Sequence, residues 1–316
     1  MGMYRCGIQK AEKNSMPPFL MAMLKRFKRT ICQRSIGITI MINTKISSVI
    51  SLLILLLGFA GCNRQESAVV PPQAGELRVF STVTAADHII AELGCKEKIV
   101  AIDRHGKVLE SMQGVTVASA GSTVSREFLS KHRINCAIIW HYQKELYEFL
   151  RKEKIYTIVV MPITLENYSD LVLELGKLCC RTSEAERLKR NFLNVLADSA
   201  VAGKVKRVYF ELYAPWKVPA AGGCIGSIMQ KAGGVFAVAA ANGGTVSAES
   251  VCMAQPEVIF YVENFADASE IAARSALCNT PAVKCNRIYA VPRHLVSEGV
   301  APEKLLKFLR EKLKDN

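Results

Sequence analysis

The stretch Ser183–Ala200, SEAERLKRNFLNVLADSA, decides how the rest of the chain is arranged. Its apolar residues recur at helical spacing, Thr182 precedes it as a helix cap, and Glu184 and Glu186 add negative charge to the first turn. The preceding stretch Leu165–Cys179 has the same helical pattern, and no strand-like run separates the two. We therefore expect two consecutive helices here, whereas the regions on either side alternate between strand and helix.

These flanking regions contain short apolar runs separated by amphipathic segments. Before the helical stretch, strands are expected at Leu77–Ser81, Ile99–Ile102, Ala137–Trp140 and Thr157–Val160, and helices at Ala85–Leu93 and Lys144–Glu153. After it, strands are expected at Val205–Glu211, Val258–Tyr261 and Ile288–Val291, and helices at Ile225–Ala232 and Pro302–Leu313. Such alternation predicts parallel sheets covered by helices. The sequence therefore predicts an α/β fold of two lobes, each a mainly parallel sheet with flanking helices, joined by one long helix with a ligand cleft between them.

An apolar run near the N-terminus predicts export. The run Ile50–Leu57 follows the basic residue Lys45. It is shorter than the roughly 20 residues that a membrane-spanning helix needs, and it suits the core of a signal peptide. The next residues, Phe59-Ala60-Gly61-Cys62, resemble the bacterial lipobox, in which the chain is cut before the cysteine and that cysteine receives a lipid. The alternative is a plain transmembrane anchor with a buried cysteine.

Residues 1–61 are thus expected to be a leader and signal peptide, and Met41 is an alternative start because Met41–Cys62 has the length of a complete signal peptide. This leader holds most of the positive charge. The full chain has 41 Lys/Arg and 28 Asp/Glu residues, a net +13, whereas the part after residue 61 has 32 and 27, a net +5. Basic residues beside an export signal stay inside the cell, so no nucleic-acid partner is expected.

The exported part is predicted to divide into four segments. Residues 62–76, with Pro71-Pro72, are expected to form the lipidated cysteine and a flexible tether. An N-terminal α/β lobe over residues 77–163, a helical linker over 164–203 and a C-terminal α/β lobe over 204–316 follow. The protein is expected to be a monomer, held to the extracytoplasmic side of a membrane by its lipid.

Eight cysteines follow Cys62, at positions 95, 136, 179, 180, 224, 252, 278 and 285. An even number in an exported chain is compatible with a disulfide framework. Most of these cysteines nevertheless lie in apolar segments spread over a large chain, which favours buried free thiols. The adjacent pair Cys179-Cys180 lacks the two to four intervening residues of a usual metal-chelating pair.

An internal echo supports the two lobes. Val124-Ser125-Arg126-Glu127 precedes the strand Ala137–Trp140 by about the same interval as Val246-Ser247-Ala248-Glu249 precedes the strand Val258–Tyr261. Glu127 and Glu249 thus occupy corresponding places in the two halves. Because open parallel sheets bind ligands beyond the carboxyl ends of their strands, two such lobes would line a cleft with loops that follow strands.

Several ordered motifs carry a resemblance to a known family. They are Arg78-Val79-Phe80-Ser81, the run Ala91–His105, the glycine-rich run Ala220–Ile228, Lys231-Ala232-Gly233-Gly234, Val246–Glu249 and Gln255–Ile259. Together, after a lipobox, they resemble the substrate-binding proteins of ABC importers for iron-siderophores, haem and cobalamin. The resemblance spans roughly residues 77–313.

This resemblance implies a periplasmic binding protein with two α/β lobes bridged by one rigid helix, here Ser183–Ala200. The ligand would be a metal chelate, such as a ferric siderophore, haem or a cobalamin-type corrinoid, and no other cofactor is implied. Glu127 and Glu249 match the positions at which family members dock on arginines of the permease dimer; the alternative is that both only satisfy helix dipoles. The first loop departs from the family pattern, because Val83-Thr84-Ala85-Ala86-Asp87 stands where relatives often have Pro-Ser-x-x-Glu.

The candidate ligand-binding residues are those just past strand ends. Arg104 and His105 offer a cation and an imidazole for an anionic chelate, and aromatic side chains suit flat ligands. The full set is Thr84, Arg104, His105, Trp140, His141, Tyr142, Tyr213, Trp216, Gly223, Glu263, Asn264 and His294. For each, a turn at the surface or packing in the core is the alternative.

Two rival functions use other residues. A bare zinc or manganese binder needs three or four converging ligands, and the five histidines show no chelating i, i+4 pair. An exported enzyme could use a Cys/His nucleophile at Cys224 or Cys252, but the chain has no Gly-x-Ser-x-Gly elbow and no His-Glu-x-x-His. We therefore expect no catalytic residues, no resident metal site, and a binding protein that delivers a chelate to an ABC permease.

Overall fold

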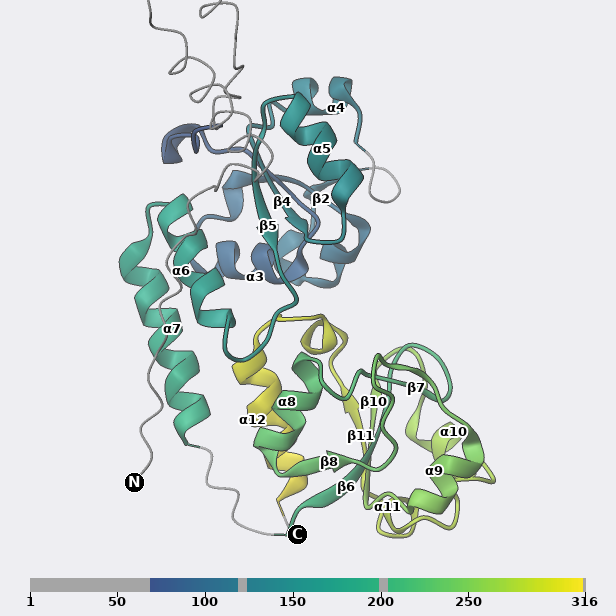
Figure 1. The fold of residues 1–316 in the computed structure, drawn as a ribbon. Coiled ribbons are helices and arrows are strands. Elements are labelled where there is room, and N and C mark those ends of the chain that lie inside the picture. Colours follow the sequence, from purple (N-terminus) through teal and green to yellow (C-terminus); the bar gives the residue numbers. More distant parts are fainter. Residues whose placement is uncertain (1–68, 119–123, 199–203, 315–316) are drawn as a thin grey trace, which may run out of the picture. The chain divides into compact units, whose positions relative to one another are not determined.

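Two separate parallel sheets form the centre of the computed structural model, which describes residues 69–118, 124–198 and 204–314 (Figure 1). The first sheet has the order β3-β2-β1-β4-β5, and all its neighbouring strands are parallel. Its strands are β1 (Val79–Ser81), β2 (Ile99–Ile102), β3 (Thr116–Val117), β4 (Cys136–Trp140) and β5 (Tyr156–Val160). This sheet and its helices are called the first lobe.

The second sheet has the order β11-β10-β6-β8 and is also parallel throughout. Its strands are β6 (Lys206–Glu211), β8 (Gly234–Phe236), β10 (Val258–Val262) and β11 (Ile288–Val291). Two further short strands, β7 (Lys217–Val218) and β9 (Gly244–Thr245), form a separate antiparallel pair. In the sequence β7 comes between β6 and β8, and β9 comes between β8 and β10. This sheet and its helices are called the second lobe, and the two lobes confirm the predicted α/β class.

Helices connect the strands in both lobes. In the first lobe and its linker they are α3 (Thr84–Glu92), α4 (Arg126–Lys131), α5 (Lys144–Lys152), α6 (Tyr168–Leu178) and α7 (Thr182–Ala197). The second lobe has α8 (Cys224–Ala232), α9 (Ala248–Ala254), α10 (Ala268–Ala273), α11 (Pro281–Lys284) and α12 (Pro302–Leu313). Short 3-10 turns occur at Ala74–Glu76, Lys96–Lys98, Arg104–Val108, Glu110–Met112 and Arg293–Val296.

The two consecutive helices stand where the sequence predicts them, with shorter ends. Helix α6 begins at Tyr168 instead of Leu165, because Thr164–Asn167 form a turn in which the Asn167 side chain accepts a hydrogen bond from the Thr164 amide at 2.8 Å. Helix α7 ends at Ala197 instead of Ala200. Figure 1 shows α6 and α7 side by side, and α7 also packs on α12 of the second lobe.

Alternation along each strand sends side chains to two different helical layers. In the first lobe, Phe80, Ala137 and Ile139 belong to the core under α4 and α5, whereas Val79 and Ile138 belong to the core shared with α3 and α6. The second lobe repeats this arrangement between a core that includes residues of α9, α10 and α11 and one that includes residues of α8 and α12. Burial on both faces explains why these strands read as continuous apolar runs.

One of these cores extends through both lobes. It joins apolar residues of α3, α6, α7, α8 and α12, and Phe192 of α7 is one of its fully buried side chains. Ile163, after β5, belongs to the same core as Val300 and Leu305 of the second lobe. We call this set the shared core. The interdomain helix is therefore packed on both lobes instead of serving as a free linker.

The N-terminal predictions lie outside the described residues. Residues 1–61, Cys62 and the tether up to Ala68 fall in this category, so their expected roles stay predictions. Within the described part of the chain, no helix has the length and hydrophobicity to cross a membrane.

All eight cysteines after Cys62 are free in the structure. Burial, which the sequence favours for them, holds for Cys95, Cys136, Cys179 and Cys224. It is wrong for Cys180, Cys278 and Cys285, which are exposed because they lie beyond helix ends or in turns.

Asp87 is the least expected member of the first lobe's interior. It belongs to the first loop segment that departs from the family pattern, but it lies inside α3 and is fully buried, and its carboxyl oxygens have no hydrogen-bond partner among the described residues. Burial raises the pKa of Asp87 to about 8; the nearby Ser81 hydroxyl opposes this shift and Asp103 adds to it. The Ser81 hydroxyl itself donates to the Val83 carbonyl.

We predict that Asp87→Asn removes a pH-dependent loss of stability. Between pH 4 and 8 the folded protein keeps Asp87 protonated while the unfolded chain ionises it, so wild-type stability falls as pH rises through this window. The slope of this contribution reaches up to about 1.4 kcal/mol per pH unit and vanishes above about pH 8, where both states are ionised. Urea unfolding of both proteins at several pH values measures it. Parallel curves for the two proteins would contradict this prediction.

Candidate functional site

A cavity of about 400 Å³ lies between the strand ends of the two lobes. Its volume falls in the range of small-molecule sites. The first lobe contributes Thr82, Thr84, Asp103, Arg104, His105, Trp140, Tyr142 and Gln143, and the second lobe contributes Tyr213, Val296, Ser297 and Glu298. We call this space the interlobe cavity.

Strand order explains why these residues meet. In the first sheet β1 and β4 are neighbours, and the chain runs from β1 to β2 on one side and from β4 to β5 on the other, which opens a crevice between their carboxyl ends. The cavity residues of the first lobe lie at or after the ends of β1, β2 or β4. In the second lobe Tyr213 follows β6 and Glu298 follows β11. Both halves of the cavity are thus built from loops at the carboxyl ends of parallel strands.

A tight turn after β2 holds the cationic side of the cavity. The Asp103 carboxylate caps this turn by accepting hydrogen bonds from the backbone amides of His105 at 2.9 Å and Gly106 at 3.1 Å. Burial raises the pKa of Asp103, although these hydrogen bonds act in the opposite direction. Gly106 allows the turn to pack on α3, because a Cβ at this position would meet an Asp87 carboxyl oxygen at 2.9 Å. Arg104 and His105 are exposed at the cavity, 3.4 Å apart between Nε and Nε2.

A glutamine fixes the aromatic side. The Gln143 side-chain oxygen accepts hydrogen bonds from the Thr82 hydroxyl at 2.6 Å and from the Trp140 amide at 2.9 Å, which ties the β1 loop to the β4 loop. The rings of Trp140 and Tyr142 lie nearly parallel, with 9° between their planes and 6.3 Å between centroids. Tyr142 is 63% exposed. A flat ligand therefore finds an aromatic wall that is already ordered.

The second lobe closes the cavity with a tyrosine and a carboxylate. Tyr213 is 38% exposed and its ring packs edge-on against Phe265, with centroids 5.1 Å apart. The Glu298 carboxylate accepts a hydrogen bond from the Ile163 amide at 2.9 Å, which connects the second lobe to the segment after β5. Next to it, Gly299 has φ +72°, and a Cβ there would lie 2.5 Å from Ile163. Only glycine fits this left-handed, close approach without strain.

Six of the predicted ligand-binding residues line this cavity: Thr84, Arg104, His105, Trp140, Tyr142 and Tyr213. Trp216 does not. Its amide donates to the Glu211 carboxylate at 2.9 Å, and the Arg274 guanidinium lies 5.2 Å from its ring centroid. Glu211 is buried and also accepts hydrogen bonds from Arg274 and the Tyr209 hydroxyl, each at 2.6 Å. This network holds the half-buried Trp216 against the core of the second lobe, so its ring does not line the interlobe cavity where the sequence places it.

The other five predicted residues also lie outside the lining of the interlobe cavity. His141 packs edge-on against Tyr142, and its buried Nδ1 has no partner among the described residues. Gly223 caps α8. The glycine that approaches neighbouring backbone closely is Gly226, because a Cβ added there would lie 2.0 Å from the Ala221 carbonyl oxygen. Glu263 accepts a hydrogen bond from the Arg293 amide at 2.9 Å, and Asn264 adopts φ +66° in an exposed turn. His294 lies at a different cavity, beside His88 and Lys304.

The predicted ligand-binding residues do not include Thr82, Asp103, Gln143, Val296, Ser297 and Glu298, which also line the cavity. Thr82 and Gln143 could have been found, because each directly follows a predicted strand or its exit loop. The segment Val296–Glu298 carries no such signal, since a 3-10 turn at Arg293–Val296 separates it from β11.

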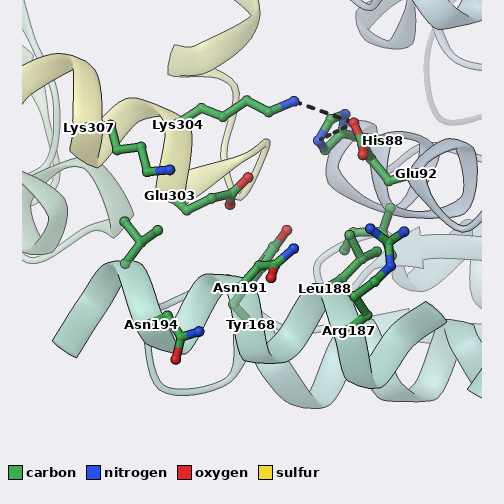
Figure 2. A pocket seen from close by; sticks show the side chains of 12 residues that line it. His88, Glu92, Tyr168, Arg187, Leu188, Asn191, Asn194, Glu303, Lys304 and Lys307 are labelled. Carbon is green, nitrogen blue, oxygen red and sulfur yellow. Dashed lines mark hydrogen bonds and ion pairs between the residues drawn. The ribbon is translucent and has the colours of Figure 1, made fainter. Parts of the chain in front are cut away.

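A second cavity, of about 420 Å³, is lined by helices instead of strand ends (Figure 2). Figure 2 shows Asn191 of α7 opposite Glu303 of α12, and Arg187 of α7 on the side of Glu92 of α3. The Lys304 ammonium lies 3.4 Å from the Glu92 carboxylate of α3, so an ion pair spans the two lobes here. Both side chains of this ion pair are exposed, so the pair contributes little to stability. None of the predicted ligand-binding residues lines this second cavity. The interlobe cavity is therefore the candidate site.

The two glutamates of the internal echo occupy equivalent structural positions. Glu127 is the second residue of α4 and Glu249 the second residue of α9, and both are exposed. Each helix is capped by a serine hydroxyl, Ser125 or Ser247, that accepts a hydrogen bond from the third amide of the helix at 3.1 Å. The helices precede β4 and β10, so the sequence echo corresponds to a structural repeat.

A family model described as "Periplasmic binding protein" matches residues 79–295. This range includes both sheets and all of the cavity residues except Val296, Ser297 and Glu298. No curated protein matches the chain in sequence.

Solved structures of periplasmic binding proteins have the same fold. The haem-binding protein HutB of Vibrio cholerae is 18% identical with a TM-score of 0.67, and the match covers 76% of this chain and all of that one. The vitamin B12-binding protein BtuF of Vibrio cholerae is 19% identical with a TM-score of 0.65, covering 75% and 96%. The haem-binding protein RhuT from Roseiflexus sp. RS-1 is 19% identical with a TM-score of 0.65, covering 74% and 97%. At these identities the three structures show that this chain shares their fold.

We predict that Glu298→Ala lowers the free energy of unfolding by about 1 kcal/mol, because the buried Ile163 amide loses its acceptor. Glu298→Gln is the matched control, since its amide oxygen can accept the same hydrogen bond. Urea denaturation monitored by circular dichroism compares the three proteins. Equal losses in both variants, or none in Glu298→Ala, would show that this hydrogen bond does not connect the lobes.

Proposed function

The chain belongs to the family of periplasmic binding proteins, and from this premise we propose that it captures a metal chelate outside the cytoplasm and delivers it to the permease of an ABC importer. The interlobe cavity carries the proposal. Its walls come from both lobes, and Trp140 and Tyr142 offer a flat aromatic surface beside the polar Arg104–His105 turn. A ligand held there touches both halves of the protein at once.

The class of ligand follows from this cavity chemistry together with the relatives. Proteins of the same fold bind haem or vitamin B12, and both ligands combine a flat apolar ring system with charged groups at its edge. Trp140 and Tyr142 suit the ring, and Arg104 suits a carboxylate or phosphate at the edge. A ferric siderophore with aromatic arms would use the same surfaces. We therefore propose a ferric siderophore, haem or a cobalamin-type corrinoid as ligand.

The rival functions have less support. Within the described residues no group of three or more His, Cys, Asp or Glu side chains is placed to hold a metal ion, which disfavours a bare zinc or manganese binder. Burial raises the pKa of Cys224 to about 11, so this thiol is unsuited to act as a nucleophile. Cys252 is half-buried and does not line the interlobe cavity, so the candidate site gives no support to an enzymatic role for this thiol.

Delivery would use the two equivalent glutamates. We propose that Glu127 and Glu249 dock the protein on arginines of a permease dimer, one glutamate for each half. Their exposure and their matching helix positions support this role. Exposed ion pairs of this kind contribute modestly to affinity but orient the encounter. A lipid on Cys62 would keep the protein at the extracytoplasmic surface of the membrane, next to its permease.

We predict that Trp140→Ala weakens chelate binding by roughly 10-fold to 100-fold, because the ligand loses half of the stacked aromatic wall. Isothermal titration calorimetry of the full chain with haem, cyanocobalamin, a ferric catecholate siderophore and zinc measures affinity for each probe. Trp216→Phe is the control, since this half-buried ring packs against the core of the second lobe and does not line the cavity. Saturable binding of zinc alone, or a chelate whose affinity survives Trp140→Ala unchanged, would contradict the proposed site.

A second prediction separates delivery from capture. The double variant Glu127→Ala/Glu249→Ala should lose uptake through its own permease while its chelate affinity stays within about twofold of wild type, because neither residue lines the interlobe cavity. Glu145→Ala is a matched control, since Glu145 is also an exposed second residue of a helix, α5. Uptake of labelled chelate by cells or permease vesicles gives the readout. Normal uptake by the double variant would rule out the docking role.

A further inference from the structure

The turn that brings Tyr213 to the interlobe cavity has an unusual backbone. The Leu212 amide donates to the Lys217 carbonyl at 2.7 Å, which closes a tight turn between β6 and β7. Within this turn Trp216 has φ +63°, the left-handed region that residues other than glycine seldom adopt. A residue stays in this region only where its surroundings hold it there. The contacts that hold Trp216 therefore also decide where Tyr213 lies.

A buried carboxylate holds the turn. Glu211 is the last residue of β6, and its side chain is 2% exposed. Its Oε2 accepts hydrogen bonds from the Trp216 amide at 2.9 Å and from the Tyr209 hydroxyl at 2.6 Å. The Trp216 carbonyl in turn accepts a hydrogen bond from the Val246 amide at 3.0 Å. The left-handed residue is thus fixed at both of its backbone polar groups, which Trp216→Phe leaves in place.

An arginine from a distant part of the chain pairs with this carboxylate. Arg274 directly follows α10, and its Nη1 lies 2.6 Å from the same Oε2 of Glu211. Its Nη2 lies 2.8 Å from the Glu270 carboxylate, one turn earlier along the chain. Burying an unpaired carboxylate is costly, and removing one partner of a buried ion pair leaves such a charge behind. Arg274 therefore keeps Glu211 in the place from which it holds the Trp216 amide.

The Tyr213 ring is held separately. It packs edge-on against Phe265, with centroids 5.1 Å apart, and the Arg293 guanidinium lies 5.2 Å from the Phe265 centroid. This packing sets the orientation of the ring, and the turn sets the position of its backbone. Among the residues that line the cavity, Tyr213 is the aromatic one from the second lobe, whereas Trp140 and Tyr142 come from the first. A shift of the turn would change the space that a flat ligand has between the aromatic groups of the two lobes.

We propose that Glu211 and Arg274 are positioning residues for ligand capture: neither lines the interlobe cavity, and together they fix the turn that presents Tyr213 to the ligand. The effect on affinity rests on the proposed function. The order of the turn does not, because it can be measured in the protein without any ligand. Two measurements, one on the turn and one on affinity, can therefore fail separately.

Hydrogen–deuterium exchange of the ligand-free full chain measures the turn. In Arg274→Ala the amides of residues 212–217 should exchange at least about tenfold faster than in the wild type, because local opening becomes easier when the Glu211 contact is lost. Arg207→Ala is the matched control. Arg207 also forms an ion pair, with Glu257 at 3.8 Å, but it lies near the amino end of β6 and does not line the cavity. Unchanged exchange of the turn in Arg274→Ala, or equal acceleration in Arg207→Ala, would overturn the proposal.

A second variant covers the case in which Arg274→Ala does not fold. Glu211→Leu/Arg274→Met removes both charges together, so no unpaired charge is buried, while the Trp216 amide still loses its acceptor. The same faster exchange at residues 212–217 is expected. Wild-type protection of the turn in this double variant would count against the role of the ion pair.

Isothermal titration calorimetry with haem, cyanocobalamin and a ferric catecholate siderophore measures the effect on capture. For a probe that binds the wild type, Arg274→Ala should weaken affinity roughly tenfold. Because Arg274 acts through Tyr213, Tyr213→Ala/Arg274→Ala should bind within about twofold of Tyr213→Ala alone. Additive losses in this double variant would show that Arg274 acts by another route and would refute the positioning role. If no probe binds the wild type, the proposed function fails, and the exchange experiment alone decides whether the ion pair fixes the turn.

Discussion

The shared core is the constraint on which the rest of this structure depends. Apolar residues of α3 and α6 in the first lobe, Phe192 of α7, and apolar residues of α8 and α12 in the second lobe all belong to this one core. Interiors packed at this density transmit position from one element to the next. A hinge that opened the lobes widely would expose part of this core to water, so on these grounds only small closure is expected when a ligand enters the interlobe cavity.

The cavity uses this fixed relation between the lobes. The hydrogen bond from the Ile163 amide to Glu298 and the close approach of Gly299 to Ile163 hold the second lobe's loop against the segment that leaves the first lobe. Glu298 therefore faces the cavity beside the Asp103–Gly106 turn of the other lobe. These contacts hold both loops in place before the ligand arrives, which lowers the entropic cost of binding.

Sequence patterns predicted the elements whose side chains are buried on both faces. They missed the short elements that are stabilised by contacts with residues distant in the sequence. Ile99–Ile102, Ile288–Val291 and Pro302–Leu313 have the predicted bounds because their apolar runs or proline start are local signals. The strand β8 and the helix α9 are short and were not predicted, since pairing and packing with distant residues stabilise them. At the site, strand exits located Arg104, Trp140, Tyr142 and Tyr213. Trp216 was misplaced because Arg274, far along the chain, helps to determine its position through Glu211. Glu298 was missed because its partner Ile163 is even more distant in the sequence.

The same packing that limits closure has a consequence for delivery. Glu127 and Glu249 each sit at the second position of a serine-capped helix that leads into a strand of its own sheet. Each sheet is joined by its buried side chains to the shared core. If both glutamates dock on a permease, a protein with freely moving lobes would present them at a variable separation, and each contact would have to form independently. A fixed separation makes the second contact nearly intramolecular once the first has formed. Under this proposed docking, two weak exposed ion pairs would act together, and the packing of the shared core would serve recognition of the permease as well as of the ligand.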